Sequence, residues 1–289
     1  MPVNDDLGKR MKEYYEHVYR FGLTRRMPVA IRIDGKAFHT FTRGFQKPFD
    51  EVLVTTMQRT MKYLCENIQG CKLGYTQSDE ITLILTDYDT LTTEAWFGYE
   101  LQKMCSIAAS MATMAFNKYF EEEVDNWGNR TFGYWWYEGG YDPEVTPIPQ
   151  EALDLAEVYQ KAIEKGAMFD ARVFNIPKEE VANLVYWRQL DAARNSIQMV
   201  GQANFSHGEL QHKSCNMIQE MLMTEREINW NDFPTHLKRG SCCIKKEVPC
   251  TDRLVGYKTE WVIDTEIPMF RGDGREYIDS LIYIEGDKE

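Results

Sequence analysis

The sequence lacks any hydrophobic run long enough to cross a membrane. A helical span needs about 18 consecutive apolar residues, and no segment approaches that length. The opening segment, MPVNDDLGKRMKEYYEHVYRFG, is polar and charged and has no apolar core of the kind that a secretory leader carries. We therefore expect no membrane segment, no leader and a cytoplasmic location.

Closely spaced metal-binding residues are also missing. The seven cysteines form no CxxC pair, and Cys242 and Cys243, which are adjacent, are poorly placed to bind one ion together. His207 and His212 lie five positions apart, which is not the four-residue spacing of a helical zinc pair. This pattern indicates free thiols in a reducing compartment and no structural zinc.

Basic residues are outnumbered by acidic ones. Lys and Arg total 33 against 45 Asp and Glu, which gives a formal net charge of −12. A protein that coats nucleic acid by neutralising its phosphates has the opposite balance, although a local basic patch stays open. The excess of carboxylates suits a site that gathers metal cations. A hydrophobic fraction of 43% and an aromatic fraction of 13% indicate a folded globular chain.

The first part of the sequence alternates between strand and helix patterns. Alternating apolar residues over 29–33 predict a strand that ends at Asp34 and Gly35. Asp50 is placed as the N-cap of a helix, because the apolar residues behind it recur at spacings of three and four: Val54, Met57, Met61, Leu64 and Ile68.

A hairpin, a long helix and one more strand complete the pattern. The β-rich runs CKLGYTQ and ITLIL are separated by residues 78–80 and predict the hairpin. We expect the helix over residues 93–120 and the strand over 169–177. The resulting β-α-β-β-α-β order predicts an α+β fold of the ferredoxin-like type, which is the palm of polymerases and cyclases.

Two domains are predicted around this fold. Residues 1–137 would form the palm-like catalytic domain, and residues 138–289 the C-terminal region. The second region begins with an inserted loop and helix at 138–168, supplies the last palm strand and continues as a mainly helical appendage. It ends in β-rich pieces, GSCCIKKEV and TEWVIDTEI.

Two acids stand at the ends of neighbouring strands in this plan. Strands 1 and 3 of a ferredoxin-like sheet are adjacent, so Asp34 and Asp79 would lie close together. Such carboxylates repel each other unless a cation lies between them, and Mg²⁺ prefers hard oxygen ligands together with phosphates and water. The sequence therefore predicts a site for two Mg²⁺ ions. Taken alone, Asp34-Gly35 more often forms an ordinary turn, and residues 78–80 more often form a solvated hairpin tip.

The segment DGKAFH has the properties of a phosphate-binding loop. Gly35 lets the backbone approach a ligand closely, and the N–H groups that follow Asp34 would surround a triphosphate. Ser78 and Lys47 would add a hydrogen-bond donor and a positive charge. On the alternative reading, Lys47 belongs to an ordinary loop and His39 is an ordinary polar residue.

Several motifs together resemble one family. RIDGKAFHTF, KPFD and YTQSDE match, in order, motifs of the tRNA-His guanylyltransferase superfamily, whose members are 3′–5′ nucleotidyltransferases. FDARVFNIP and YWRQLDAARNS resemble its F-D-x-R strand and its W-R-Q-x-D helix. The resemblance covers most of residues 5–215.

The resemblance implies roles for individual residues. Asp34 and Asp79 match the metal-binding aspartates of the family, and Gly35 matches a glycine whose carbonyl also binds metal. Glu80 and Lys47 match charged residues of the catalytic site. The nucleotide-binding set implied by the resemblance comprises Asp34, Gly35, Lys36, Ala37, Phe38, His39, Ser78 and Asp79.

The resemblance also implies a reaction. ATP adenylylates a tRNA 5′-monophosphate and pyrophosphate leaves; the 3′-OH of an incoming nucleotide, often GTP, then attacks the activated phosphate and AMP leaves. Family members assemble as homotetramers, each a dimer of dimers. Two alternatives stay open at this point: a palm-type nucleotidyl cyclase would use the same acids, and a non-catalytic tRNA-binding protein would keep the fold.

One segment departs from the eukaryotic pattern. AARNSIQ, residues 192–198, stands where eukaryotic members carry H-I-N-N-L-Y-N, and Ala193 occupies the histidine position. This resembles the Thg1-like branch of bacteria and archaea, which favours template-directed repair of tRNA 5′ ends. The role implied is therefore 5′-end repair or addition of the extra guanosine to tRNA-His. Residues 138–168 have no counterpart that we can place in the eukaryotic enzymes.

Candidate RNA contacts lie in the predicted C-terminal helices. For each of them taken alone, a solvated surface position is the favoured interpretation. The aromatic run YWWY, residues 134–137, could stack on bases, although core packing is the favoured interpretation, and His207 is a further possible polar contact. The residues predicted to contact tRNA are Arg188, Arg194, Asn195, Lys238 and Arg239.

Overall fold

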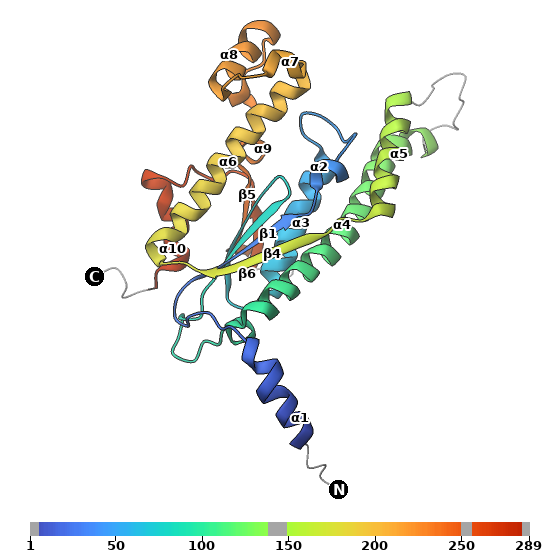
Figure 1. Cartoon of the computed structure of the whole chain (residues 1–289). Helices are drawn as coiled ribbons and strands as arrows, with labels where there is room; N and C mark the ends of the chain where they lie inside the picture. Colours follow the sequence, from blue (N-terminus) through green and yellow to red (C-terminus); the bar gives the residue numbers. More distant parts are fainter. Residues whose placement is uncertain (1–5, 138–148, 250–255, 285–289) are drawn as a thin grey trace.

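A six-stranded antiparallel sheet forms the centre of the molecule (Figure 1). The computed structural model describes residues 6–137, 149–249 and 256–284. The four palm strands lie in the order β4-β1-β3-β2, so the predicted ferredoxin-like α+β fold is confirmed. The strands are β1 (Val29–Gly35), β2 (Cys71–Gln77), β3 (Glu80–Leu85), β4 (Phe169–Asn175), β5 (Ser241–Pro249) and β6 (Tyr257–Asp264).

The C-terminal strands β5 and β6 extend this same sheet beyond β2. Thr76 of β2 pairs with Ser241 of β5, and Gly240 makes the close approach possible. A Cβ atom on Gly240 would come within 2.5 Å of the carbonyl oxygen of Thr76. The sheet therefore contains strands that lie before and after residue 137 in the sequence, which is the predicted boundary between the two domains. That division stays a prediction.

Alternation along β1 gives the two faces of the sheet different characters. Ile31 and Ile33 belong to the main core, under the helices of one face. Ala30 belongs to a second core on the opposite face, and Arg32 and Asp34 share that face because side chains alternate along a strand. Asp34 thus lies on the side away from the main core.

Three helices cover the main-core face: α3 (Glu51–Asn67), α4 (Leu101–Tyr137) and α5 (Gln150–Lys165). As predicted, Asp50 caps α3, and its side chain accepts a hydrogen bond from the N–H of Leu53 at 2.9 Å. The helix expected over 93–120 begins later and ends later. Phe97 and Gly98 have left-handed φ values of 50° and 61°, which confine residues 96–99 to a 3₁₀ turn.

Helix α6 (Lys178–Asn204) covers the opposite face together with α10 (Glu276–Ile282). It extends past the sheet, and Figure 1 shows the small helices α7 and α8 at its far end. A third core joins that end to α8, with Trp230 and Leu222 among its buried residues. The remaining short helices of the region are α7 (His207–Leu210), α8 (Cys215–Arg226) and α9 (Thr235–Arg239).

The first described segment extends away from the sheet (Figure 1). Helix α1 (Asp6–Met11) continues into a π turn (Lys12–Glu16) and a 3₁₀ turn (His17–Tyr19), and none of the three contains a buried residue. The short helix α2 (Phe38–Phe41) follows β1 directly. Among the described helices, none combines the length and the apolar character that crossing a bilayer requires.

Candidate active site

The two predicted metal ligands, Asp34 and Asp79, lie at the same end of the sheet. Strands β1 and β3 are adjacent, and Asp34 is directly opposite Glu80, the residue after Asp79. The main-chain N–H of Gly35 donates a hydrogen bond to the carbonyl oxygen of Asp79 at 3.1 Å. This bond ties the end of β1 to the hairpin tip and holds Asp34 and Asp79, which we call the acidic pair, beside each other.

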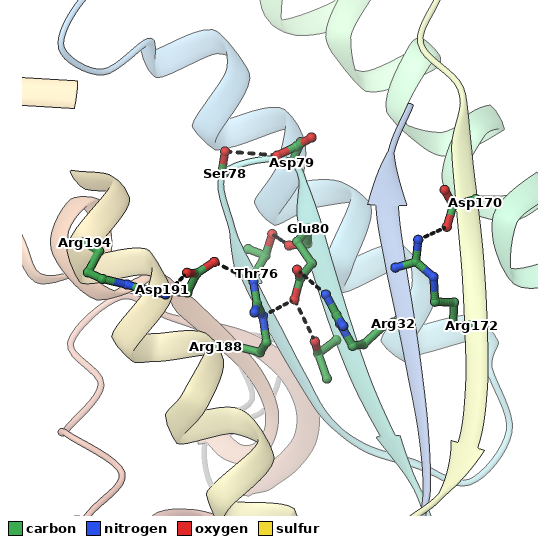
Figure 2. Close-up of polar contacts among 11 residues, drawn as sticks. Arg32, Thr76, Ser78, Asp79, Glu80, Asp170, Arg172, Arg188, Asp191 and Arg194 are labelled. Atoms are coloured by element: carbon green, nitrogen blue, oxygen red, sulfur yellow. Dashed lines mark hydrogen bonds and ion pairs between the residues drawn. The ribbon is translucent and has the colours of Figure 1, made fainter. Parts of the chain in front are cut away.

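The hairpin that carries Asp79 has a two-residue turn. Gln77 at the end of β2 pairs with Glu80 at the start of β3, so only Ser78 and Asp79 form the turn. Ser78 has a left-handed φ of 50°, and its hydroxyl donates to Oδ1 of Asp79 at 3.1 Å (Figure 2). Glu80, which the sequence placed in the bend, is instead the first residue of β3 and is buried.

Both members of the acidic pair have raised pKa values. Burial is the largest cause of the raised pKa of Asp79, and the negative charge of Asp34 adds to it. Burial also leads for the pKa of Asp34, followed by the like charges of Glu80 and Asp170. The folded chain therefore holds two carboxylates in an environment that disfavours their charge, and a bound cation would relieve this.

Packing requires a glycine at position 35. A Cβ atom there would lie 2.2 Å from Cδ2 of Phe38, whose ring fills the space beneath the turn. Ala37 turns the chain into α2 with a left-handed φ of 54°. Phe38 cannot yield, because three rings hold it at centroid distances of 5.1 to 5.4 Å: Phe41, Phe116 and Phe169. The turn after Asp34 is thus anchored in the core.

A cavity of about 680 Å³ opens beside the acidic pair. It brings together most of the predicted nucleotide-binding residues, although Asp34 and Lys36 are not part of its lining. The N–H groups of Gly35 and Lys36 donate to the carbonyls of Asp79 and Met168, so these two donors are not available to a phosphate. The predicted residues that line the cavity are Gly35, Ala37, Phe38, His39, Lys47, Ser78 and Asp79.

The loop over residues 42–50 forms the other wall of this cavity and is held by Asp50. The carboxylate of Asp50 accepts hydrogen bonds from the N–H of Gln46 at 2.9 Å and from the hydroxyl of Tyr159 at 2.7 Å. Tyr159 belongs to α5, within the predicted inserted segment. The inserted helix therefore supports the loop that presents Lys47 to the cavity.

Glu80 forms the centre of a buried ion-pair network rather than part of the cavity. Its carboxylate accepts from Arg188 of α6 at 2.6 Å and from Arg32 of β1 at 2.8 Å (Figure 2). Arg188 also pairs with Asp191 at 2.8 Å, and Asp191 pairs in turn with Arg194. We call these five residues the arginine network. It fastens α6 to the sheet next to the hairpin that carries Asp79.

The predicted RNA contacts occupy different environments. Arg188 has a side chain only 7% exposed and committed to the network, and Lys238 is buried, with its ammonium donating to the carbonyl of Asn231. Asn195 lines a smaller cavity next to the large one. The structure thus places Arg188 and Lys238 in structural contacts rather than at the surface. Contact between RNA and any of the five predicted residues stays a prediction.

Arg194, Arg239 and His207 are more exposed than Arg188 and Lys238. Arg194 is 62% exposed at its side chain, and the carbonyl of Arg239 accepts the hydroxyl of Tyr75 at 2.6 Å. His207 is exposed at the start of α7. The side chains of the YWWY run, residues 134–137, lie outside the described residues.

Sequence reasoning missed several polar residues on the face that carries Asp34. Asp170 of β4 is directly opposite Asp34, and Arg172 is directly opposite Arg32. Figure 2 shows Asp170 and Arg172 together on β4, where they form an exposed ion pair at 3.4 Å. The spacing in the sequence could have indicated these residues. Arg32 and Asp34 are two residues apart, as are Asp170 and Arg172, so each pair shares one face of its strand.

The oxygen ligands offered by the protein fit a Mg²⁺ ion that takes only some of its ligands from the protein. Within residues 6–137, 149–249 and 256–284, no group of three or more His, Cys, Asp or Glu side chains is arranged to hold a metal. The acidic pair offers two carboxylates next to a cavity wide enough for phosphates and water. Mg²⁺ commonly takes one or two carboxylates and completes its shell with phosphates and water, so it suits this arrangement.

A palm sheet with Asp34 near the end of β1 and Asp79 in the turn before β3 fits the class of nucleotidyl-transferring enzymes. Comparison with known proteins identifies the family within this class. The model described as "Thg1: tRNAHis guanylyltransferase" matches residues 8–177. The chain belongs to this family, and it is a nucleotidyltransferase.

Similar proteins support this assignment over nearly the whole chain. A bacterial tRNA(His) guanylyltransferase (Thg1)-like protein solved in complex with ATP is 41% identical, with a TM-score of 0.74, and the match covers 96% of this chain and 99% of that one. A structure of such a bacterial protein in complex with GTP is 38% identical, with a TM-score of 0.72, over 97% and 100% of the two chains. The tRNA(His) guanylyltransferase of Saccharomyces cerevisiae is 25% identical over 75% of this chain and 82% of its own.

Proposed function

We propose that the protein adds nucleotides in the 3′–5′ direction to the 5′ end of tRNA, in a reaction that depends on Mg²⁺. The observation that carries the proposal is the acidic pair beside a cavity of about 680 Å³. Burial disfavours the charged form of both carboxylates. The bacterial relatives were solved with ATP and with GTP, and these are the two nucleotides that the proposed reaction uses.

The site divides the work among its residues. Asp34, Asp79 and the carbonyl of Gly35 would hold two Mg²⁺ ions. When bound, these ions would neutralise phosphate charge and stabilise the leaving group. The cavity would hold the triphosphate, with the N–H groups of residues 37–39 and the ammonium of Lys47 as donors. Phosphoryl transfer needs positioning and charge neutralisation more than a strong base, and the site supplies both.

Two steps would follow at this site. In the first, an oxygen of the RNA 5′-monophosphate attacks the α-phosphate of ATP, and pyrophosphate leaves. In the second, the 3′-OH of GTP or of a template-paired nucleotide attacks the adenylylated 5′-phosphate, and AMP leaves. A 5′-triphosphate end would enter the second step directly, with pyrophosphate as the leaving group.

Extension of a labelled RNA tests the proposal. The protein would be incubated with Mg²⁺, ATP, GTP and a tRNA transcript that lacks its first nucleotide. We expect growth at the 5′ end that is lost in Asp34→Ala and Asp79→Ala. Formation of a cyclic nucleotide without RNA growth would identify a nucleotidyl cyclase instead, and tight RNA binding without turnover would identify a binding protein.

The wider role follows from the same proposal. Repair of truncated tRNA 5′ ends, or addition of the extra guanosine to tRNA-His, would use this chemistry in the cytoplasm. Assembly into a homotetramer is part of the proposal. Size measurement by light scattering tests the assembly separately from the activity.

A further inference from the structure

One half-exposed aromatic residue on the polar face of the sheet has no role in the site described so far. Trp187 of α6 is 48% exposed. The guanidinium carbon of Arg188 lies 4.4 Å from the centroid of its ring, and that of Arg32 lies 5.3 Å from it. The network that binds Glu80 therefore also fixes the indole in place, while half of its surface stays open.

The position of Trp187 relative to the acidic pair follows from the register of β1. Arg32, which contacts the indole, precedes Asp34 by two residues on the same face of the strand. Two residues along a strand span about 7 Å. Met199, further along α6, lines the large cavity, and twelve residues of helix span about 18 Å. Trp187 thus lies on the face of the sheet that carries Asp34, about 18 Å along α6 from Met199 at the cavity wall.

Two exposed guanidinium groups lie in this part of the surface, and each is paired with a carboxylate, Arg172 with Asp170 and Arg194 with Asp191. Arg172 of β4 is directly opposite Arg32 and has a side chain that is 57% exposed. Arg194 lies seven residues after Trp187, on the same side of α6, and is 62% exposed. An open aromatic ring between exposed guanidinium groups is the combination that binds single-stranded nucleic acid, through base stacking and phosphate contacts.

We propose that Trp187, Arg172 and Arg194 form the surface on which the 5′-terminal nucleotide of the RNA docks, with its base stacked on the indole and its phosphates near the guanidinium groups. We call these three residues the Trp187 platform. The inference rests on the proposed function. It deepens that function because it gives the RNA end a surface of its own, on the face of the sheet that carries Asp34 and outside the lining of the nucleotide cavity.

Equilibrium binding of RNA tests the platform without relying on activity. The probes are two tRNA transcripts, one with an ordinary 5′-terminal nucleotide and one whose 5′-terminal residue is abasic. We expect the wild-type protein to bind the abasic RNA about tenfold more weakly, because stacking of one base is lost. Trp187→Ala should bind the ordinary RNA about tenfold more weakly and should no longer distinguish the two RNAs. Trp187→Phe should restore most of the affinity.

The controls separate stacking from general damage. Tyr257→Ala removes an aromatic residue that is 72% exposed on β6, and it should bind both RNAs as the wild type does. The affinity of Trp187→Ala for GTP without RNA should also be unchanged. Arg172→Ala and Arg194→Ala should weaken binding of both RNAs equally and reduce the salt dependence of the dissociation constant.

Two results would overturn the platform. One is a wild-type protein whose affinity for RNA is the same with and without the 5′-terminal base. The other is a Trp187→Ala variant that still distinguishes the two RNAs. Failure of the proposed function has a different signature: the wild-type protein would extend no RNA at all, and the binding comparison would still decide on the platform.

Discussion

Asp79 and Glu80 are adjacent acidic residues, yet their surroundings in the structure are opposite in charge. Glu80 is buried and matched by Arg32 and Arg188 at 2.8 and 2.6 Å. Asp79 is partly buried beside another carboxylate, Asp34, and its pKa is raised. The difference teaches that the fold itself compensates the charge of Glu80, whereas burial and Asp34 disfavour the charge of Asp79, and we propose that a ligand completes that site. A site can therefore be recognised by charge that the fold leaves uncompensated.

Substitution of either member of the acidic pair should have the largest effect. Asp34→Asn and Asp79→Asn should each reduce nucleotide addition by about a thousandfold or more, because the phosphates lose the charge neutralisation on which the transfer depends. Circular dichroism should show an unchanged fold. Single-turnover extension of a 5′-triphosphorylated tRNA measures the effect, and a residual rate within tenfold of the wild type would count against metal binding by these acids.

Breaking the arginine network should affect stability instead. Glu80→Gln leaves two largely buried guanidinium groups without their shared carboxylate, which costs about 3 kcal/mol in the free energy of unfolding. Denaturant unfolding measures this cost. Glu51→Gln is the control, since Glu51 is 75% exposed in a pair at 3.8 Å with Arg130, and it should change stability by less than about 0.5 kcal/mol. Equal stabilities of the two variants would contradict the assignment of Glu80.

A smaller effect is expected from Gly35→Ala. The added methyl group would lie 2.2 Å from the Phe38 ring, which its aromatic neighbours hold, so the turn must move, at a cost of about 1–3 kcal/mol. The affinity for ATP should fall as the turn shifts. Gly128→Ala in α4 is the matched control, because among the described residues its Cβ would meet Phe132 alone, at 3.9 Å, and it should stabilise the protein by about 0.5–1 kcal/mol.

Tyr159→Phe tests whether α5 supports the loop that forms one wall of the cavity. The variant loses the hydroxyl that donates to Asp50 at 2.7 Å but keeps the ring. We expect a loss of about 1–2 kcal/mol in stability and a KM for the nucleotide that rises a few fold, because the loop over 42–50 is less well held. If only the stability changes and the KM stays the same, α5 does not support the nucleotide cavity.

The smallest effect is a gain in stability. A raised pKa means that the folded chain binds a proton more readily at Asp79 than the unfolded chain does. The associated stability is present below the ordinary value of 3.8 and is lost as the pH rises through the folded pKa. Without metal at neutral pH, Asp79→Asn should therefore melt a few degrees higher than the wild type. The difference should vanish in acid, and a lower melting temperature at neutral pH would assign Asp79 a structural role.

Local sequence patterns predicted the strands and helices of the palm. Contacts between residues far apart in the sequence have no such pattern and could not be predicted. The strand before Asp34, the cap at Asp50 and the hairpin at Asp79 each have a signature within a few residues. The pair between Glu80 and Arg188 joins positions 108 apart, so nothing local marked Arg188 as buried. The addition of β5 and β6 to the sheet is equally non-local. The later start of α4 was missed because left-handed φ at Phe97 has no reliable sequence signal.

The metal-linked state of the acidic pair is the central claim, and the melting temperature with and without Mg²⁺ and ATP tests it most directly. In wild-type protein and in Glu80→Gln, addition of both ligands should raise the melting temperature, because binding to the folded state alone stabilises it. Asp79→Asn should gain little or nothing from the same addition. An equal gain in Asp79→Asn and wild type would contradict the claim that Asp34 and Asp79 together complete the site.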